Sequence, residues 1–200
     1  MQAIELADYR EAVTRLYLST SGLAEFRARR DELFATHPQS PIPAAERAAF
    51  EGLRYFPPSE DAIVEVPLRE EPGHLDIDTG GPDGVIRYDR VGVLGTPWGQ
   101  VSLWWIAAYG GGLFLPLRDG TSARETYGGG RYLTDTVKGT FGRGVQLLGS
   151  GRVRLDLNYL YNPSCAYDSR WACPLAPPEN RLEAEIRAGE LAYAPTVPVR

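Results

Sequence analysis

The sequence predicts a mostly β domain, an antiparallel barrel or sandwich of about eight strands with two or three N-terminal helices; a mixed α+β class is the alternative. Two observations support this prediction. Apolar residues recur every three to four positions through the first 56 residues, and every second position from residue 61 onward. Most of the 22 glycines and 16 prolines lie after residue 57, where they separate short apolar segments as turns do.

The N-terminal part is expected to be helical. One helix face is marked by apolar residues at helical spacing, namely Ile4, Tyr9, Val13, Leu16 and Tyr17. After Gly22 the same period continues in a second helix, through Leu23, Phe26, Arg30, Leu33 and Phe34. A third, short helix is expected over residues 43–51, because Pro43 suits a first helical turn and Gly52 suits the position after a helix end.

From residue 61 the alternation of apolar and polar side chains predicts strands. We expect them at residues 62–66, 84–88, 91–94, 101–106, 113–117, 131–133, 152–158 and 182–186. Residues 109–112 (YGGG) predict a hairpin turn, and residues 69–83 predict an exposed loop rich in Glu, Asp, Gly and Pro. No composition break marks a second domain, so we expect one domain over residues 1–200, in which a helical segment (1–56) packs on a β-rich body (61–200).

Charge and composition exclude several classes of partner. The net charge of −5 argues against nucleic acid, because phosphate recognition needs a basic face. The N-terminus has neither a basic region nor a long apolar run, so we expect no signal peptide, no membrane partner and a cytoplasmic protein.

A polar cluster surrounds three consecutive glycines after an apolar segment. It comprises Asp119, Thr121, Thr126, Tyr127 and Arg131. Asp119 and Arg131 are separated by a predicted turn, so we expect them to meet as a charge-assisted pair. The cluster suits a polar ligand such as a sugar, carboxylate or phosphate; the alternative is a loop network that satisfies its own polar groups.

A second polar segment follows the predicted strand at 152–158 and contains Asn158, Tyr161 and Asn162. Two cysteines, Cys165 and Cys173, bracket the loop after it. Three interpretations stay open for them: a disulfide, two packed thiols, or a metal-binding or reactive thiol. Zinc needs four ligands and the only histidines lie far away in the sequence, so we expect no metal.

Familiar enzyme motifs are absent from the sequence. It has no G-x-S-x-G elbow, no H-E-x-x-H pair and no dinucleotide or phosphate-loop fingerprint, so we expect no cofactor. Carboxylates such as Asp119 could still act as acid or base, but spacing alone does not pair them.

The two polar segments together resemble a known family, the domain-of-unknown-function family 1684 of bacterial and archaeal proteins. The similarity covers most of the chain, at residues 26–27 (FR), 40–42 (SPI), 50–56 (FEGLRYF), 115–121 (LPLRDGT), 125–133 (ETYGGGRYL), 156–158 (DLN), 161–167 (YNPSCAY), 173–182 (CPLAPPENRL) and 188–190 (AGE). Leu117 and Leu157 stand where the family pattern has Phe, which keeps an apolar side chain but changes its shape. The resemblance implies that both polar segments belong to one shared design, and it implies no activity.

Three functions are compatible with these observations. The first is a β-barrel module that binds a small polar metabolite in a concavity at the barrel mouth. We expect eight residues to line that site: Asp119, Thr121, Thr126, Tyr127, Arg131, Asn158, Tyr161 and Asn162. The alternatives are a metal-independent hydrolase or lyase, in which Asp119 is the base and Arg131 holds an anion, and a protein-interaction scaffold with an exposed apolar patch.

Overall fold

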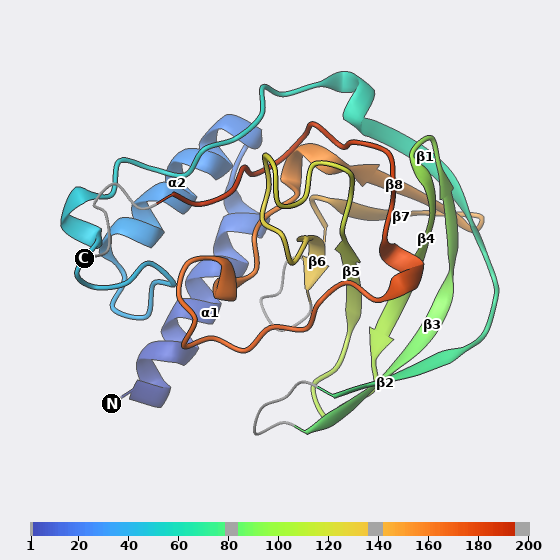
Figure 1. Cartoon of the computed structure of the whole chain (residues 1–200), viewed down its shortest axis with the longest axis horizontal. Helices are drawn as coiled ribbons and strands as arrows, with labels where there is room; N and C mark the ends of the chain where they lie inside the picture. The colour runs from blue at the N-terminus through green and yellow to red at the C-terminus, as the bar shows by residue number, and fades with distance from the viewer. Residues whose placement is uncertain (1, 79–83, 136–141, 195–200) are drawn as a thin grey trace.

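The structure, a computed structural model, describes residues 2–78, 84–135 and 142–194 and begins with two helices (Figure 1). These are α1 (Gln2–Ser19) and α2 (Leu23–Thr36). Eight strands follow: β1 (Ile63–Arg69), β2 (His74–Asp78), β3 (Val85–Thr96), β4 (Gly99–Ile106), β5 (Leu113–Leu117), β6 (Arg131–Asp135), β7 (Val145–Gly149) and β8 (Arg152–Asp156). Within those ranges, no helix combines the length and the apolar character that a bilayer crossing needs.

The strands form one antiparallel sheet of order β6-β5-β4-β3-β1-β8-β7, with β2 beside β3. A bulge between Arg90 and Gly92 bends β3, which pairs with β1, β2 and β4. Figure 1 shows the sheet curled into a half-barrel, with both helices lying together on one side of it. The predicted class, mostly β with about eight antiparallel strands and N-terminal helices, is therefore confirmed.

Two element predictions are wrong in the N-terminal half. Residues 43–51 contain only the 3₁₀ turn η1 (Arg47–Ala49), and the Arg47 side chain donates to the carbonyls of Ile42 and Pro38. Strand β2 lies inside residues 69–83, which were expected as a loop, and it pairs along its whole length with β3.

Further corrections concern the C-terminal half. The strand expected at 152–158 ends at Asp156, because the Asp156 carboxylate accepts the backbone N–H of Asn158 and turns the chain into the 3₁₀ turn η4 (Leu157–Tyr159). Strand β7 was not predicted. Residues 182–186 form no strand: the N–H of Leu182 and the carbonyl of Ala184 bond to the turn at residues 118–120 instead.

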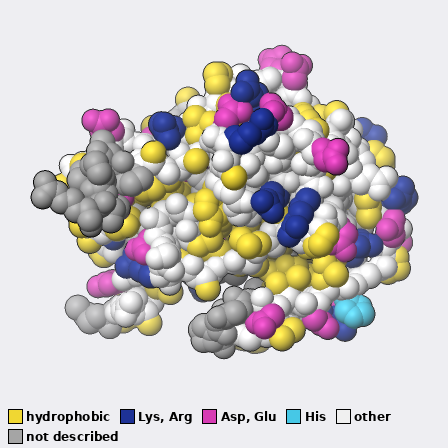
Figure 2. Space-filling view, viewed as in Figure 1, with side chains coloured by type: hydrophobic (Ala, Val, Ile, Leu, Met, Phe, Trp, Pro, Cys, Tyr) yellow, Lys and Arg dark blue, Asp and Glu magenta, His cyan; other side chains and the backbone are white. Residues whose placement is uncertain are grey.

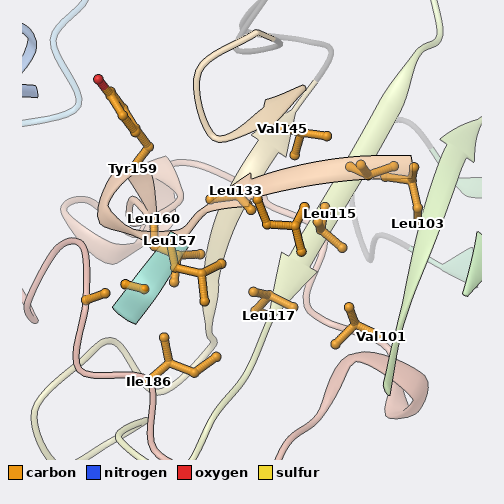
Figure 3. Close-up of a cluster of buried hydrophobic side chains, with 14 of the residues drawn as sticks. Val101, Leu103, Leu115, Leu117, Leu133, Val145, Leu157, Tyr159, Leu160 and Ile186 are labelled. Carbon is orange, nitrogen blue, oxygen red and sulfur yellow. The ribbon is translucent and has the colours of Figure 1, made fainter. Parts of the chain in front are cut away.

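The main core fills the space between the inner face of the sheet and the helices. Alternate strand residues such as Val101, Leu103 and Leu115 meet η4 and the C-terminal segment in Figure 3. Tyr17 and Phe26 connect the helices to this core through edge-to-face ring contacts, with centroids 4.9 Å apart.

The opposite face of strands β4, β5 and β6 is buried as well. Tyr88, Trp104, Phe114 and Tyr132 form a second aromatic cluster there. The segment near the 3₁₀ turn η6 (Pro178–Asn180) packs on it, because the Trp104 indole N–H donates to Asn180 Oδ1 at 2.9 Å. Every residue of β6 is buried as a result, and β6 provides the first residue of the candidate site.

Candidate functional site

Asp119 and Arg131 form an ion pair inside the protein, as the sequence predicted. Asp119 follows β5 and Arg131 begins β6, so the Gly-rich turn brings them together. Arg131 Nη2 lies 2.8 Å from Asp119 Oδ2, and the two side chains are 0% and 1% exposed. The pair therefore lies out of reach of bulk solvent.

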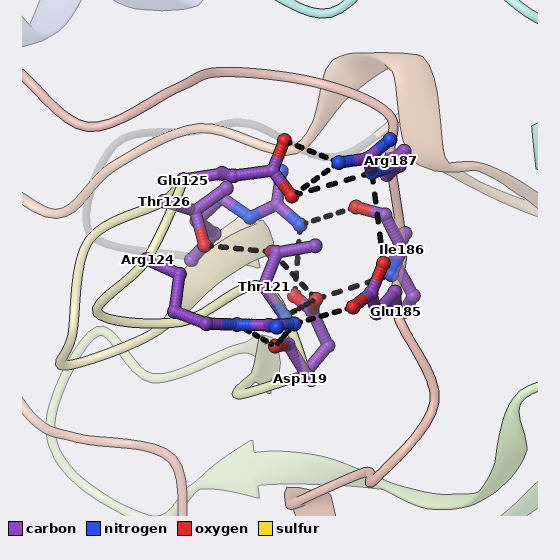
Figure 4. Close-up of polar contacts among 10 residues, drawn as sticks. Asp119, Thr121, Arg124, Glu125, Thr126, Glu185, Ile186 and Arg187 are labelled. Atoms are coloured by element: carbon purple, nitrogen blue, oxygen red, sulfur yellow. Dashed lines mark hydrogen bonds and ion pairs between the residues drawn. The ribbon is translucent and has the colours of Figure 1, made fainter.

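The Asp119 carboxylate has hydrogen bonds on both oxygens (Figure 4). Its Oδ1 accepts the Thr121 N–H at 2.9 Å, the Thr121 hydroxyl at 2.6 Å and the Ile186 N–H at 3.1 Å. The Thr121 hydroxyl also contacts that of Thr126 at 2.9 Å. Burial alone would raise the pKa of Asp119, but Arg131 and Thr121 outweigh it, and the pKa lies below its usual value. A buried carboxylate that is paired with Arg131 and has a lowered pKa is a weak base, so this geometry does not favour the hydrolase or lyase alternative.

Arg131 holds the C-terminal segment in place. Besides Asp119, it donates to the carbonyls of Ile186 (2.9 Å), Glu190 (3.2 Å) and Ala188. Burial lowers the pKa of the Arg131 guanidinium, although Asp119 opposes the shift. We name Asp119, Thr121, Thr126 and Arg131 the Arg131 network.

Exposed ion pairs lie at the edge of this network. Arg187 contacts both oxygens of Glu125 at 2.8 Å, and Arg124 contacts Glu185 (Figure 4). On the face seen in Figure 2, basic and acidic side chains are likewise interspersed, with apolar ones between them.

A second buried network is centred on the Glu190 carboxylate. Arg30 of α2 donates to its Oε2 at 2.8 Å, and Asn162 donates its backbone N–H to Oε2 and its Nδ2 to Oε1, both at 3.0 Å. The Tyr167 hydroxyl donates to Oε1, and Arg30 also donates to the Tyr55 hydroxyl. Burial by itself lowers the pKa of Arg30, but Glu190 and the phenols reverse this and raise it well above its usual value. We name these five residues the Glu190 network.

The two networks meet at Glu190, because Arg131 bonds its carbonyl and Asn162 its carboxylate. Arg131 and Asn162, the residues that sequence reasoning placed in one concavity, thus converge on one residue. Tyr161 lies nearby, with its ring 5.7 Å from the Arg30 guanidinium.

Two predicted site residues lie elsewhere. Asn158 bonds to both backbone polar groups of Ser59 and to the Asp156 carboxylate, where it joins η4 to the start of β1. Tyr127 donates its hydroxyl to Cys165 Sγ at 3.6 Å, on the outer side of the sheet. The structure therefore divides the eight predicted residues among several contacts.

A small cavity adjoins the Glu190 network where α1, α2 and residues 161–167 meet. Its volume is about 20 Å³, room for roughly one water molecule. The polar and aromatic side chains that line it are Tyr9, Tyr17, Arg30, Phe34, Tyr161, Asn162, Ser164 and Tyr167. Burial raises the pKa of Tyr9 and of Tyr17, while Arg30 opposes it, so both phenols stay neutral.

One residue that lines this cavity has a polar atom without a partner. Asn162 Oδ1 is buried and accepts no hydrogen bond from the described residues. Its orientation is fixed, because Nδ2 donates to both Glu190 Oε1 (3.0 Å) and the Leu191 carbonyl (2.8 Å), and a flipped amide would face two acceptors with its oxygen. An unpaired buried amide oxygen costs about 1–3 kcal/mol.

A larger hollow of about 370 Å³ lies between Asp31 and residues 50–54 and 190–194. Asp31 accepts the Leu53 N–H at 3.0 Å, and burial raises its pKa. In the described part of the chain, no unpartnered buried polar atom belongs to a residue that lines this hollow. We therefore take the smaller cavity as the candidate site.

The described residues contain no group of three or more His, Cys, Asp or Glu that could hold a metal ion. Cys165 and Cys173 lie close together on the outer side of the sheet, with no disulfide between them.

Sequence reasoning missed Arg30, Glu190 and Tyr167 as site residues. A signal was present for Arg30, which interrupts the apolar face of its helix, because a charged residue at a buried position needs a partner. Its partner Glu190 is 160 positions away, so no local pattern connects them.

Comparisons with known proteins agree with this fold. The family model described as "Protein of unknown function (DUF1684)" matches residues 48–191, a range that contains both Asp119 and Glu190 but not Arg30. The solution NMR structure of an uncharacterized protein from Haloarcula marismortui is 35% identical; the similarity covers 84% of this chain and 91% of that one, with a TM-score of 0.57. None of the curated proteins compared with the chain matches it.

Proposed function

This chain belongs to the DUF1684 family of proteins of unknown function, and we propose that it binds a small, neutral, polar metabolite. The site is the cavity between α1, α2 and residues 161–167. The single observation that carries the proposal is the buried Asn162 Oδ1, an acceptor without a hydrogen-bond partner among the described residues, on a residue that lines the cavity.

The ligand class follows from the charge of the lining. Arg30 is the one cation among the lining residues, and Glu190 already neutralises it at 2.8 Å. Tyr9 and Tyr17 contribute neutral hydroxyls. Because an unpaired charge is costly inside a protein, a neutral ligand with an O–H or N–H donor fits best.

Cavity size decides how such a ligand sits. About 20 Å³ accepts a hydroxyl, amine or amide head group, and not an entire metabolite. The head group donates to Asn162 Oδ1, and the remainder of the ligand lies against α1. In this proposal, two of the eight predicted residues, Tyr161 and Asn162, contact the ligand. The other six hold the segments around the cavity in position: Asp119, Thr121, Thr126, Tyr127, Arg131 and Asn158.

A thermal-shift screen with hydroxyl-, amine- and amide-bearing metabolites tests the proposal. We expect compounds with one unhindered donor to raise Tm in a concentration-dependent way. The free energy of unfolding should increase by RT ln(1 + [L]/Kd), which is about 2.7 kcal/mol at a ligand concentration of 100 Kd. Val13 lines the cavity, so Val13→Leu adds one methylene there without removing a hydrogen bond. This variant should abolish the ligand-induced shift while its own Tm changes by only a few degrees.

Leu18→Phe is the matched control, because Leu18 lies on the same helix and is 74% exposed. It should keep the ligand-induced shift. If no compound stabilises the wild type, or if Val13→Leu and Leu18→Phe respond alike to a hit, the cavity is filled by water alone and the proposal fails.

A further inference from the structure

Cys165 and Cys173 are within reach of each other. Cys165 lies in the 3₁₀ turn η5 (Ser164–Ala166), and the loop that follows returns to Cys173. The Sγ of Cys173 accepts the backbone N–H of Cys165 at 3.3 Å. Since the Sγ of Cys165 is joined to that same nitrogen through only its Cα and Cβ, the two sulfurs lie near each other, as disulfide formation requires.

Both sulfurs also face hydrogen-bond donors. The Cys165 N–H points at Cys173 Sγ, and the Tyr127 hydroxyl points at Cys165 Sγ from 3.6 Å. Burial and the contact with Cys165 raise the pKa of Tyr127 to about 12, so its hydroxyl stays a donor at neutral pH. Donors that point at sulfur favour the thiolate, which is the reactive form. Both cysteines are partly exposed, so a small reagent can approach them.

We propose that Cys165 and Cys173 form a redox-active dithiol that a low-molecular-weight disulfide oxidises to a reversible intramolecular disulfide. The thiolate of one cysteine attacks a sulfur of the reagent, whose S–S bond breaks and releases one thiolate. The second cysteine then attacks the mixed disulfide and expels the other thiolate. In total the two protein thiols lose two electrons and two protons, and the reagent gains them as two thiols.

Closing this bond changes the segment beside the candidate cavity. Ser164 and Tyr167 flank Cys165, both line the cavity, and Tyr167 bonds to Glu190. A disulfide to Cys173 holds this turn against the outer side of the sheet. The dithiol itself does not depend on ligand binding, so the two proposals can fail separately.

Arg170 and Arg181 give a direct assay. Trypsin cleaves after them and places Cys165 in the peptide of residues 155–170 and Cys173 in that of residues 171–181. The full-length protein is equilibrated with a series of oxidised-to-reduced glutathione ratios, acid-quenched, alkylated and digested. The expected product is a linked peptide pair, two hydrogens lighter than the sum of the peptides, from protein that runs as a monomer without reductant.

The linked pair should increase with the glutathione ratio and disappear after treatment with dithiothreitol. Cys165→Ser and Cys173→Ser should each give only the glutathione adduct of the remaining cysteine. Recovery of only glutathione adducts from the wild type, of only alkylated thiols at every ratio, or of linked peptides only from covalent dimers would overturn the proposal. The assay uses only the wild-type protein for this decision, so a variant that fails to fold does not affect it.

Discussion

Asp119→Asn is the sharpest test of the Arg131 network. The substitution keeps the size and shape of the side chain and removes one charge. Three donors face Asp119 Oδ1 and one donor of Arg131 faces Oδ2. In the variant, the amide oxygen can accept from all three donors only if the amide NH₂ group points at the Arg131 guanidinium, so that two donors face each other.

The expected cost follows from that geometry. Arg131 would remain buried at 0% exposure without a counter-charge, and removing one partner of a buried pair costs about 3–5 kcal/mol. A domain of this size loses about 2–4 °C of Tm per kcal/mol, so we expect a decrease of roughly 6–20 °C. Against a total stability of about 5–15 kcal/mol, the loss is large.

Glu125→Gln is the matched control for Asp119→Asn, and both residues are shown in Figure 4. It makes the same carboxylate-to-amide change opposite an arginine, but Glu125 and Arg187 are 32% and 61% exposed. Water screens such a pair, so its loss should shift Tm far less. Urea unfolding followed by far-UV circular dichroism gives both free energies, provided that the m-values agree. Equal effects of the two substitutions would refute the idea that burial makes the Asp119 pair important.

The same variant predicts a pH dependence. The pKa of Asp119 is lowered in the folded protein, so its contribution is complete above the unfolded value of about 3.9 and is lost as the pH falls through the folded value. The difference in unfolding free energy between wild type and Asp119→Asn should therefore be constant near neutral pH and shrink below about pH 4. A difference that grows in acid would contradict the assignment.

Two further predictions concern single contacts. Gly189→Ala should lower the free energy of unfolding by clearly more than the roughly 1–2 kcal/mol that an alanine with left-handed backbone costs. The reason is that a Cβ at Gly189 (φ +75°) would lie 2.6 Å from the Leu160 carbonyl oxygen. Gly149→Ala (φ +79°), where no atom lies within 4 Å of the added Cβ, should cost only that amount in urea unfolding. Asn180→Ala should lower the free energy of unfolding by roughly 3 kcal/mol in the same measurement, because it leaves the Trp104 indole N–H and the Ser102 carbonyl without their hydrogen bonds. A loss below about 1 kcal/mol would show that water replaces these hydrogen bonds.

The strands were predictable where one face is buried. In β8, Val153 and Leu155 are 1% exposed and face the core. Arg152, the first residue of this strand, is exposed, as the alternation indicated. Residues 182–186 show why alternation is not sufficient. Ile186 is buried as expected, but its N–H bonds to the Asp119 side chain instead of a neighbouring strand. The period reports which side chains are buried, and not where the backbone hydrogen bonds go.

Strands β2 and β7 were missed for the opposite reason. In β2 the alternation is short, because only Leu75 and Ile77 are apolar and both are only half-buried, and in β7 three consecutive residues, Leu147 to Gly149, are exposed. Their pairing with β3 and β8 forms them, and pairing is a property of the tertiary fold.

In the candidate site, too, local contacts were predictable from the sequence and long-range contacts were not. The Asp119–Arg131 pair was predictable because a short Gly-rich turn joins the partners, and it is confirmed. The Arg30–Glu190 pair was not, since its partners come from opposite ends of the chain. The cavity could not be predicted at all, because its walls come from two helices and a loop whose packing no local pattern describes.

The two buried ion pairs have a common physical reason. Residues 186–190 belong to none of the eight strands, and the carbonyls of Ile186, Ala188 and Glu190 accept hydrogen bonds from Arg131 instead. With the backbone fixed in this way, the Glu190 carboxylate stays where both Asn162 N–H groups reach it. Asn162 cannot then rotate to satisfy its own oxygen. The unpartnered Asn162 acceptor is therefore a consequence of the two networks around it. In the proposed function, these networks decide which ligand fits, although their other residues do not contact it.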